Sequence, residues 1–258
     1  MRIVIKIGTS TLAHKTGRIN IRRVEELCKV MSDLKNAGHE IILVSSGAIG
    51  MGVGKLSLKE RPTDIPTKQA AAAVGQCELM YTYDKLFSEY NHTVAQILIT
   101  SEDIEYADRK ANFENTICRL LELDVIPILN ENDTIATNEI VIGDNDTLGA
   151  VVTKAVSADL LIILSDIDGL FTDDPHKNQS AVLLHTVEEI TPEIECMTKG
   201  SASNLGTGGM TTKLNAAKIA TEAGADMVIA NGENPSVLYD IVNGKDIGTR
   251  FLAKGNKQ

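Results

Sequence analysis

The fold is decided by the stretch RIVIKIGTSTLAHKTGRINIRRVEELCKVMSDLKNAGHEIILVSSG, residues 2–47, in which two apolar, β-branched runs enclose a segment with helical spacing. The runs are RIVIKIG at 2–8 and EIILVSS at 40–46. Intervals of three or four residues, followed by a stop signal at Gly38, connect Ile21, Val24, Cys28, Met31 and Leu34. The stretch therefore predicts two buried parallel strands joined by a helix that covers one face of a sheet.

The same alternation continues to the end of the chain. Further strand-like runs are TVAQILIT at 93–100, VIPILN at 125–130, DLLIILSD at 159–166 and DMVIAN at 226–231. Helices are expected over about 67–90, 109–123, 146–157 and 209–223. This pattern predicts an α/β protein with an open, mainly parallel sheet, whose ligands lie beyond the carboxyl ends of the strands.

Composition and charge exclude several classes of function. Of the 258 residues, 43% are hydrophobic and 23% charged, as in ordinary globular proteins. The opening apolar run is too short for a signal peptide or a membrane span, so we expect a cytoplasmic protein that does not bind membranes. A formal charge of −10 without a basic cluster disfavours nucleic-acid binding.

Cysteine and histidine chemistry is not indicated. The four cysteines are far apart and form no Cys-x-x-Cys pair, so reduced and mostly buried thiols are expected rather than disulfides or a zinc site. None of the five histidines lies in a polar cluster, and no Ser/His/Asp or Cys/His arrangement is visible. The sequence therefore argues against hydrolytic nucleophilic catalysis and gives no support for metal ligation by histidine.

Polar and glycine-rich clusters follow the predicted strands, where an α/β sheet binds ligands. They are GTS at 8–10, SSGAIGMGVG at 45–54, NENDT at 130–134 and SDIDGLFTDDP at 165–175. The glycines of 45–54 do not have the spacing of a dinucleotide-binding fingerprint. GTGGMTTK at 206–213 precedes a predicted helix and suits an anion, yet it is no P-loop because Leu214 follows Lys213.

Two lysines are candidates for contacting an anion, each with an alternative explanation. Lys6 interrupts an apolar strand, where it either pairs with an anion or lies at a sheet edge and reaches solvent. Lys213 falls one turn into a helix, where a cation is unfavourable for the dipole, which mildly favours a function over a solvated side chain. NENDT and GDNDT at 143–147 are either turns and helix caps or, taken together, part of a site.

Phosphoryl transfer matches these features, because it requires positioning and positive charge rather than covalent chemistry. A carboxylate acceptor, with an unperturbed pKa of about 4.3, would already be a nucleophile at neutral pH and would need no general base. The lack of a candidate histidine is then explained.

The chain resembles the amino acid kinase family nearly end to end. The motifs that carry the resemblance are KIGTS, VSSGAI, KQAAAAVGQCELMYTYDKLF, RKANFENT, VIPILNENDT, GDNDTL, SDIDGLFTDDP, GTGGMTTK and GTRF. The combination of NENDT, GDND and GTGGMTTK resembles the motifs of one branch of this family. That branch phosphorylates the side chain of L-glutamate with ATP, the first step of proline synthesis. The resemblance implies a three-layer αβα sandwich with roughly eight strands. It also implies one kinase domain over residues 1–258, with the glutamate site mainly in the N-terminal part and the ATP site mainly in the C-terminal part.

The resemblance also implies residue roles. Lys6 and Lys213 would contact the transferring phosphoryl group, and Asp146 would place both lysines. Ser46, Asp133 and Asn145 would bind glutamate. The nucleotide site would consist of Lys6, Ser165, Asp166, Thr207, Gly208, Gly209, Met210, Thr211, Thr212 and Lys213. Magnesium would accompany ATP, held by phosphates and water without a dedicated protein site.

Partners and departures from the family are expectations of the same kind. Feedback inhibition by proline and a homo-oligomer, dimer or tetramer, are implied. Many members continue past GTRF into a PUA domain, whereas this chain stops eight residues after Arg250, so none is expected. Gly149 stands where the family often has Ser. The rival functions are another amino acid kinase, acting on acetylglutamate, aspartate, carbamate or a nucleoside monophosphate, and a non-catalytic amino-acid sensor.

Overall fold

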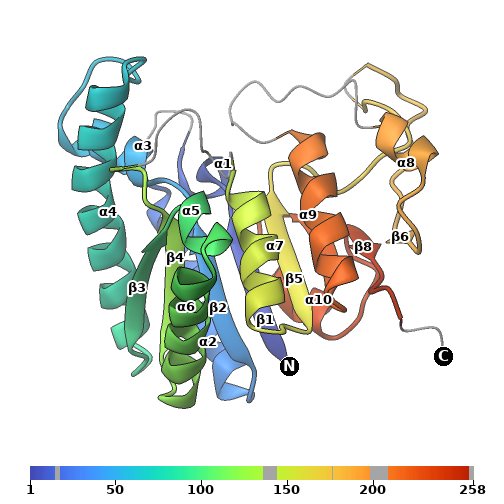
Figure 1. Cartoon of the computed structure of the whole chain (residues 1–258). Helices are drawn as coiled ribbons and strands as arrows, with labels where there is room; N and C mark the ends of the chain where they lie inside the picture. The colour runs from blue at the N-terminus through green and yellow to red at the C-terminus, as the bar shows by residue number, and fades with distance from the viewer. Residues whose placement is uncertain (15–17, 136–143, 176, 198–208, 256–258) are drawn as a thin grey trace.

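An eight-stranded sheet forms the middle layer of the computed structural model, which describes residues 1–14, 18–135, 144–175, 177–197 and 209–255 (Figure 1). The strands are β1 Arg2–Ile7, β2 Glu40–Ser45, β3 Val94–Ile99, β4 Ile126–Glu131, β5 Leu160–Ser165, β6 Thr186–Val187, β7 Asp226–Asn231 and β8 Thr249–Phe251. Their order in the sheet is β3-β4-β2-β1-β5-β7-β8-β6. All neighbours are parallel except β7 and β8, so the predicted open, mainly parallel sheet is confirmed.

Helices cover both faces of the sheet and give a three-layer sandwich (Figure 1). They are α1 Thr9–Leu12, α2 Ile21–Asn36, α3 Ala48–Lys55, α4 Ile65–Ser88, α5 Ser101–Glu105, α6 Ala107–Glu122, α7 Asn145–Ala155, α8 Pro192–Met197, α9 Met210–Glu222 and α10 Val237–Val242. One core joins the sheet to α6, α7 and α9, and the other joins it to α2, α4 and α10. Val4 faces the first core, whereas Ile3 and Ile5 face the second. Alternate residues of the central strand β1 are thus buried on both sides, which explains its continuous apolar run.

The predicted elements are present, with shifts of a few residues at their ends. All six apolar runs are strands, and the four later helices are α4, α6, α7 and α9. Strands β6 and β8 have two and three residues, too few to show a periodicity. Ile21 was wrongly expected in the core: it is the first residue of α2 and 62% exposed. The cysteines also differ from the prediction of mostly buried thiols: Cys28 is buried, but Cys77 and Cys196 are exposed.

Helices α3 and α4 pack with their backbones in contact, because two glycines face each other. A Cβ atom on Gly75 would lie 1.7 Å from the carbonyl oxygen of Ala48, and one on Gly52 would lie 1.8 Å from that of Ala71. No side chain fits at either position without separating the helices. The contact fixes α4 against the loop that follows β2.

We expect Gly75→Ala to lower the free energy of unfolding by about 3 kcal/mol, the upper part of the range for overpacking, because the helices must move apart. Gly54→Ala in α3 is the matched control, since nothing lies within 4 Å of its Cβ position. This control should be neutral or stabilising by about 0.5 to 1 kcal/mol, from the helix propensity of alanine. Urea unfolding measures both, and equal effects of the two substitutions would contradict the assigned packing.

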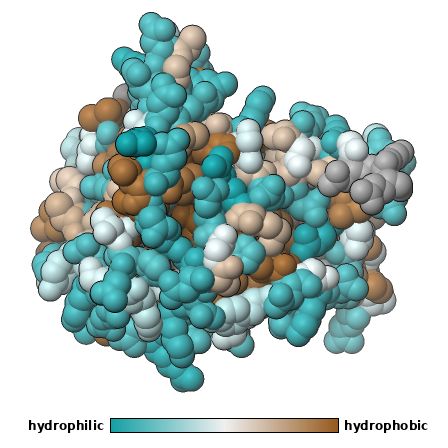
Figure 2. Space-filling view, turned by 90° about the horizontal axis from the view of Figure 1, so that it is seen from below, coloured by the Kyte–Doolittle hydropathy of each residue, from teal (hydrophilic) through white to brown (hydrophobic). Residues whose placement is uncertain are grey.

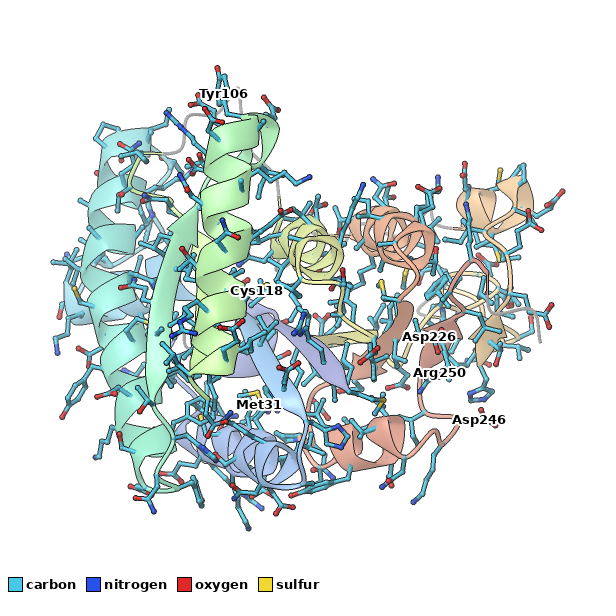
Figure 3. All side chains as sticks on the ribbon, turned by 60° about the horizontal axis from the view of Figure 1, so that its bottom comes forward. Met31, Tyr106, Cys118, Asp226, Asp246 and Arg250 are labelled. Atoms are coloured by element: carbon cyan, nitrogen blue, oxygen red, sulfur yellow. The ribbon has the colours of Figure 1, made fainter. Side chains whose placement is uncertain are left out.

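The antiparallel end of the sheet is held by a charged pair. Arg250 of β8 lies beside Asp226 of β7, with Nη1 and Oδ2 3.0 Å apart (Figure 3). The same guanidinium donates to the carbonyl of Ile241 in α10. The arginine of the GTRF motif therefore ties a strand that periodicity could not predict to its neighbours.

The surface seen from below is mostly hydrophilic, with smaller hydrophobic areas between the polar side chains (Figure 2). Among the residues that the structure describes, no helix combines the length and the apolar character needed to cross a bilayer.

Candidate active site

The candidate site lies where β1, β2, β4 and β5 end and α7 and α9 begin. Lys6 comes from β1, Ser46 follows β2, and Ser165 ends β5. Asn145 and Asp146 are the first two residues of α7. The carboxyl ends of these parallel strands share one edge of the sheet, as the polar clusters in the sequence predicted.

Lys6, Asp146 and Lys213 form a buried ionic group, here called the lysine–aspartate cluster. Lys6 Nζ lies 2.6 Å from Asp146 Oδ1, and Lys213 Nζ lies 3.1 Å from Asp146 Oδ2. The side chain of Asp146 is only 1% exposed. The hydroxyl of Thr212 lies 2.9 Å from the same Oδ2 atom. Two lysines far apart in the sequence therefore converge on one carboxylate.

The electrostatics of this cluster favour an anion. Burial raises the pKa of Asp146, but the Lys6 and Lys213 ammonium groups outweigh it and hold that pKa below its usual range. The carboxylate is ionised and neutralises only one of two cations, so a net positive charge remains. Lys6 is on a central strand between β2 and β5, which excludes the alternative of a sheet-edge lysine. Lys213 is likewise buried, which excludes a solvated helix lysine.

A second group, here called the amide cluster, consists of Gln76, Asn130, Asn145 and Ser46. Asn145 Nδ2 donates to Ser46 Oγ at 2.7 Å and to Asn130 Oδ1 at 3.0 Å. Asn130 Nδ2 in turn donates to Gln76 Oε1 at 3.0 Å. The sequence predicted Ser46 and Asn145 but missed Gln76 and Asn130, although both lie in motifs that carried the family resemblance.

Two further carboxylates are close in the chain to residues of the amide cluster: Asp133 follows Asn130 by three residues, and Asp144 directly precedes Asn145. Asp133 is in the turn after β4, and burial raises its pKa. Asp144 caps α7 by accepting from the Thr147 N–H at 2.8 Å, and burial is the main cause of its raised pKa. In the described part of the GDNDT segment, Asp144 caps α7 while Asn145 and Asp146 join the two clusters, so the two explanations are compatible.

The residues predicted for the nucleotide site are only partly described. Ser165 Oγ donates to Asp166 Oδ1 at 3.1 Å at the end of β5. Gly209 precedes α9, whose first turn contains Met210, Thr211 and Thr212, and among the described residues no side chain caps this helix. No described side chain therefore competes with an anion for its first N–H groups. Thr207 and Gly208 lie outside the described residues.

Two glycines lie beside Lys6. A Cβ atom on Gly8 would lie 3.6 Å from Lys6 Nζ, and one on Gly149 would lie 3.4 Å from Lys6 Cβ. Gly149 of α7 therefore packs against the aliphatic part of the catalytic candidate. Position 149, where the resemblance leads us to expect Ser, thus lies against Lys6 of the lysine–aspartate cluster.

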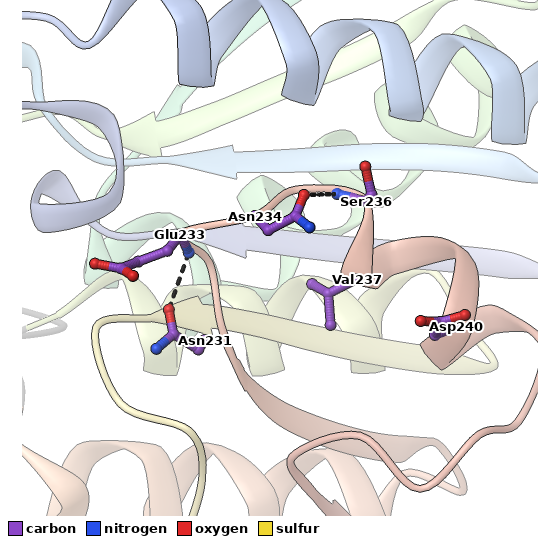
Figure 4. A pocket seen from close by; sticks show the side chains of 6 residues that line it. All are labelled: Asn231, Glu233, Asn234, Ser236, Val237 and Asp240. Carbon is purple, nitrogen blue, oxygen red and sulfur yellow. Dashed lines mark hydrogen bonds between the residues drawn. The ribbon is translucent and has the colours of Figure 1, made fainter.

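A pocket of about 290 Å³ lies at the end of β7 and the start of α10 (Figure 4). Its lining residues are Asn231, Glu233, Asn234, Ser236, Val237 and Asp240. Asn231 and Asn234 accept from the backbone N–H groups of Glu233 and Ser236, and these bonds shape the loop. Because its charged lining residues are carboxylates, this pocket is unsuited to a phosphate chain, unlike the lysine–aspartate cluster.

A protein-held metal does not match the described residues. They contain no group of three or more His, Cys, Asp or Glu side chains that could hold a metal ion. Asp146, the most buried carboxylate of the site, already pairs with two ammonium groups, Lys6 through Oδ1 and Lys213 through Oδ2.

The chain is similar to known proteins over nearly its whole length. Residues 1–231 match the model of the amino acid kinase family. The chain is 56% identical to the glutamate 5-kinase of Clostridium perfringens, covering 98% of this chain and 96% of that protein. It is 54% identical to the glutamate 5-kinase of Clostridium acetobutylicum, covering 98% and 95%. The carbamate kinase of Giardia lamblia bound to AMP-PNP has a similar fold, with a TM-score of 0.71, 17% identity and 98% of each chain covered.

Proposed function

Because the chain belongs to the amino acid kinase family, we propose that it transfers the γ-phosphoryl group of ATP to the side-chain carboxylate of L-glutamate. The products are ADP and L-glutamyl 5-phosphate, and the reaction is the first step of proline biosynthesis. The observation that carries the proposal is at the start of α7, where Asn145 joins the amide cluster and Asp146 joins the lysine–aspartate cluster. Acceptor and phosphoryl sites are thus placed by consecutive residues.

The two lysines stabilise the transferring group. A glutamate carboxylate oxygen forms a bond to the γ-phosphorus, and the bond from that phosphorus to the β,γ-bridging oxygen breaks, releasing ADP. Lys6 and Lys213 approach the equatorial oxygens, and Asp146 holds both ammonium groups in place before the substrates bind. Since the attacking carboxylate is already ionised at neutral pH, the reaction needs no general base.

The amide cluster and Asp133 bind the amino-acid end of glutamate. Ser46 and Asn145 supply hydrogen-bonding groups, and Asp133 supplies a carboxylate for the substrate ammonium. Burial raises the pKa of Asp133, which is the direction expected for a carboxylate that awaits a cationic partner. The hydrogen bond from Asn145 to Ser46 supports the roles of these two residues.

The nucleotide binds between the C-terminal end of β5 and the N-terminal end of α9. Ser165 and Asp166 line one side, and Gly209 with the first turn of α9 lines the other and presents Lys213. Thr207 and Gly208, which lie outside the described residues, are proposed to contact the nucleotide from the family resemblance alone. The substrate is MgATP, whose magnesium is held by phosphate oxygens and water. The uncapped N-terminus of α9 supports phosphate binding there, because its backbone N–H groups have no competing side-chain acceptor among the described residues.

The domain organisation, the inhibition by proline and the oligomeric state are also proposals. We infer one kinase domain over residues 1–258, divided into a mainly glutamate-binding N-terminal part and a mainly ATP-binding C-terminal part. Inhibition by proline and assembly into a dimer or tetramer remain predictions from the family.

A substrate panel tests the proposed activity. With ATP and hydroxylamine, L-glutamate should give an acyl hydroxamate, whereas acetylglutamate and aspartate should give little. ADP release should stay near background with carbamate and with nucleoside monophosphates. Turnover of any of these acceptors without turnover of glutamate would overturn the assignment, and an absence of turnover with all of them would favour the sensor.

A further inference from the structure

Gln76 is a buried polar residue of α4 that reaches the site from the layer behind it. Its side chain is 7% exposed, and Oε1 accepts from Asn130 Nδ2 at the end of β4. Asn130 is itself buried, so neither amide exchanges this bond for one to bulk water. A buried side-chain pair of this kind fixes the orientation of both amides.

One backbone donor fixes which end of each amide in the amide cluster is the oxygen and which is the NH₂ group. The N–H group of Glu131 lies 2.9 Å from Asn130 Oδ1, and because a backbone N–H can only donate, this atom of Asn130 is the oxygen. The other end of the Asn130 amide is then the NH₂ group, and its partner on Gln76 must be an acceptor. Gln76 and the Glu131 backbone thus hold the two ends of Asn130.

The orientation passes from Asn130 to the acceptor site. Asn145 must present its NH₂ group to Asn130 Oδ1, and the same nitrogen donates to Ser46 Oγ. Asn145 Oδ1 accepts no hydrogen bond from any described residue, so it is available as an acceptor. Ser46 Oγ already accepts one bond, which leaves its hydroxyl hydrogen available as a donor.

We infer that Gln76 is a positioning residue for the amino-acid substrate, acting through Asn130 to present an acceptor on Asn145 and a donor on Ser46. The inference rests on the proposed function. An acceptor beside a donor is complementary to the ammonium and carboxylate on the α-carbon of glutamate. Without the Gln76 acceptor, the Asn130 NH₂ group is left buried and unpaired, and the amide loses one of the two contacts that orient it.

A second bond from the same face of α4 supports this role. Tyr83, two turns after Gln76, is fully buried, and its hydroxyl lies 2.8 Å from Ser45 Oγ. Ser45 Oγ donates to the carbonyl of Ser46 at 3.1 Å. Helix α4 therefore contacts the ends of both β4 and β2, and the glycine contact with α3 fixes its distance from them.

Gln76→Met tests the inference, because it keeps the length of the side chain and removes the amide. We expect the KM for L-glutamate to rise about tenfold, with kcat and the KM for ATP little changed, as for a lost buried hydrogen bond of about 1.4 kcal/mol. The preference for L-glutamate over glutarate, which lacks the ammonium group, should fall by a similar factor. Leu79→Met, one turn along the same buried face, is the packing control and should leave the KM and this preference unchanged.

Gln76→Glu separates orientation from packing, since its carboxyl group keeps an acceptor for Asn130 and should retain the preference for glutamate over glutarate. If Gln76→Met kept the wild-type KM and preference, or if Leu79→Met changed them equally, the inference would be overturned. Failure of the proposed function is distinguishable, because the wild-type protein would then not phosphorylate glutamate at all.

Discussion

Replacing Lys213 by alanine is expected to lower kcat by about 10²- to 10³-fold, the effect of removing one preorganised charge contact from a transition state. Glutamate binding should remain largely intact, because the amide cluster contains no atom of Lys213. The fold should also persist, since Lys6 still neutralises Asp146. Steady-state kinetics with saturating glutamate and ATP measure kcat, and calorimetry measures glutamate binding.

Lys218→Ala is the matched control on the same helix. Lys218 pairs with Glu195 at a partly exposed position, away from the lysine–aspartate cluster. Such a surface pair contributes little, about 0 to 1 kcal/mol, so kcat should stay near the wild-type value. An unchanged kcat in Lys213→Ala would remove Lys213 from the mechanism.

Asp146→Asn is expected to cost about 3 to 5 kcal/mol of unfolding free energy, because it leaves two buried ammonium groups without a counter-charge. MgATP should stabilise this variant more than the wild type, since phosphate oxygens replace the missing negative charge. Urea unfolding with and without MgATP measures both effects. A variant as stable as the wild type would contradict the assigned ion pairs.

The same substitution makes a prediction about pH. The pKa of Asp146 is lowered in the folded protein, so its ionisation stabilises the fold fully above the unfolded pKa of about 3.9. That contribution is lost as the pH falls through the folded value. The difference in stability between wild type and Asp146→Asn should therefore be constant from about pH 8 to 5 and shrink only below about pH 4. A difference that varied between pH 8 and 6 would point to another titrating group.

Strand and helix periodicity predicted the sheet because most of its strands are buried on both faces. Between Arg2 and Gly8 the run is apolar except for Lys6, and the structure shows why: alternate side chains enter two different cores. Periodicity also placed Ile21 in the core, although it lies on the first turn of α2, beyond the packed part of the helix. Periodicity did not predict strands β6 and β8, because they contain too few residues to show a repeat.

The candidate site was predictable where a residue conflicted with its surroundings. Lys6 in an apolar strand required an anion, and Asp146 is that anion. Gln76 and Asn130 carried no such conflict, since a glutamine in an amphipathic helix and an asparagine at the end of a strand are ordinary. Their pairing depends on how α4 crosses behind β4, which local sequence does not specify.

The start of α7 limits how the acceptor can change. Asn145 and Asp146 are joined by one peptide unit, which keeps their Cα atoms about 3.8 Å apart in any trans chain. A shift of α7 moves both residues together. It therefore cannot change the distance between Asn145, which binds the α-carbon end of the substrate, and Asp146, which places the lysines at the reacting carboxylate. Variants that prefer an acid one methylene longer or shorter should therefore arise from substitutions at the ends of β2 and β4, because α7 keeps the spacing of Asn145 and Asp146 constant.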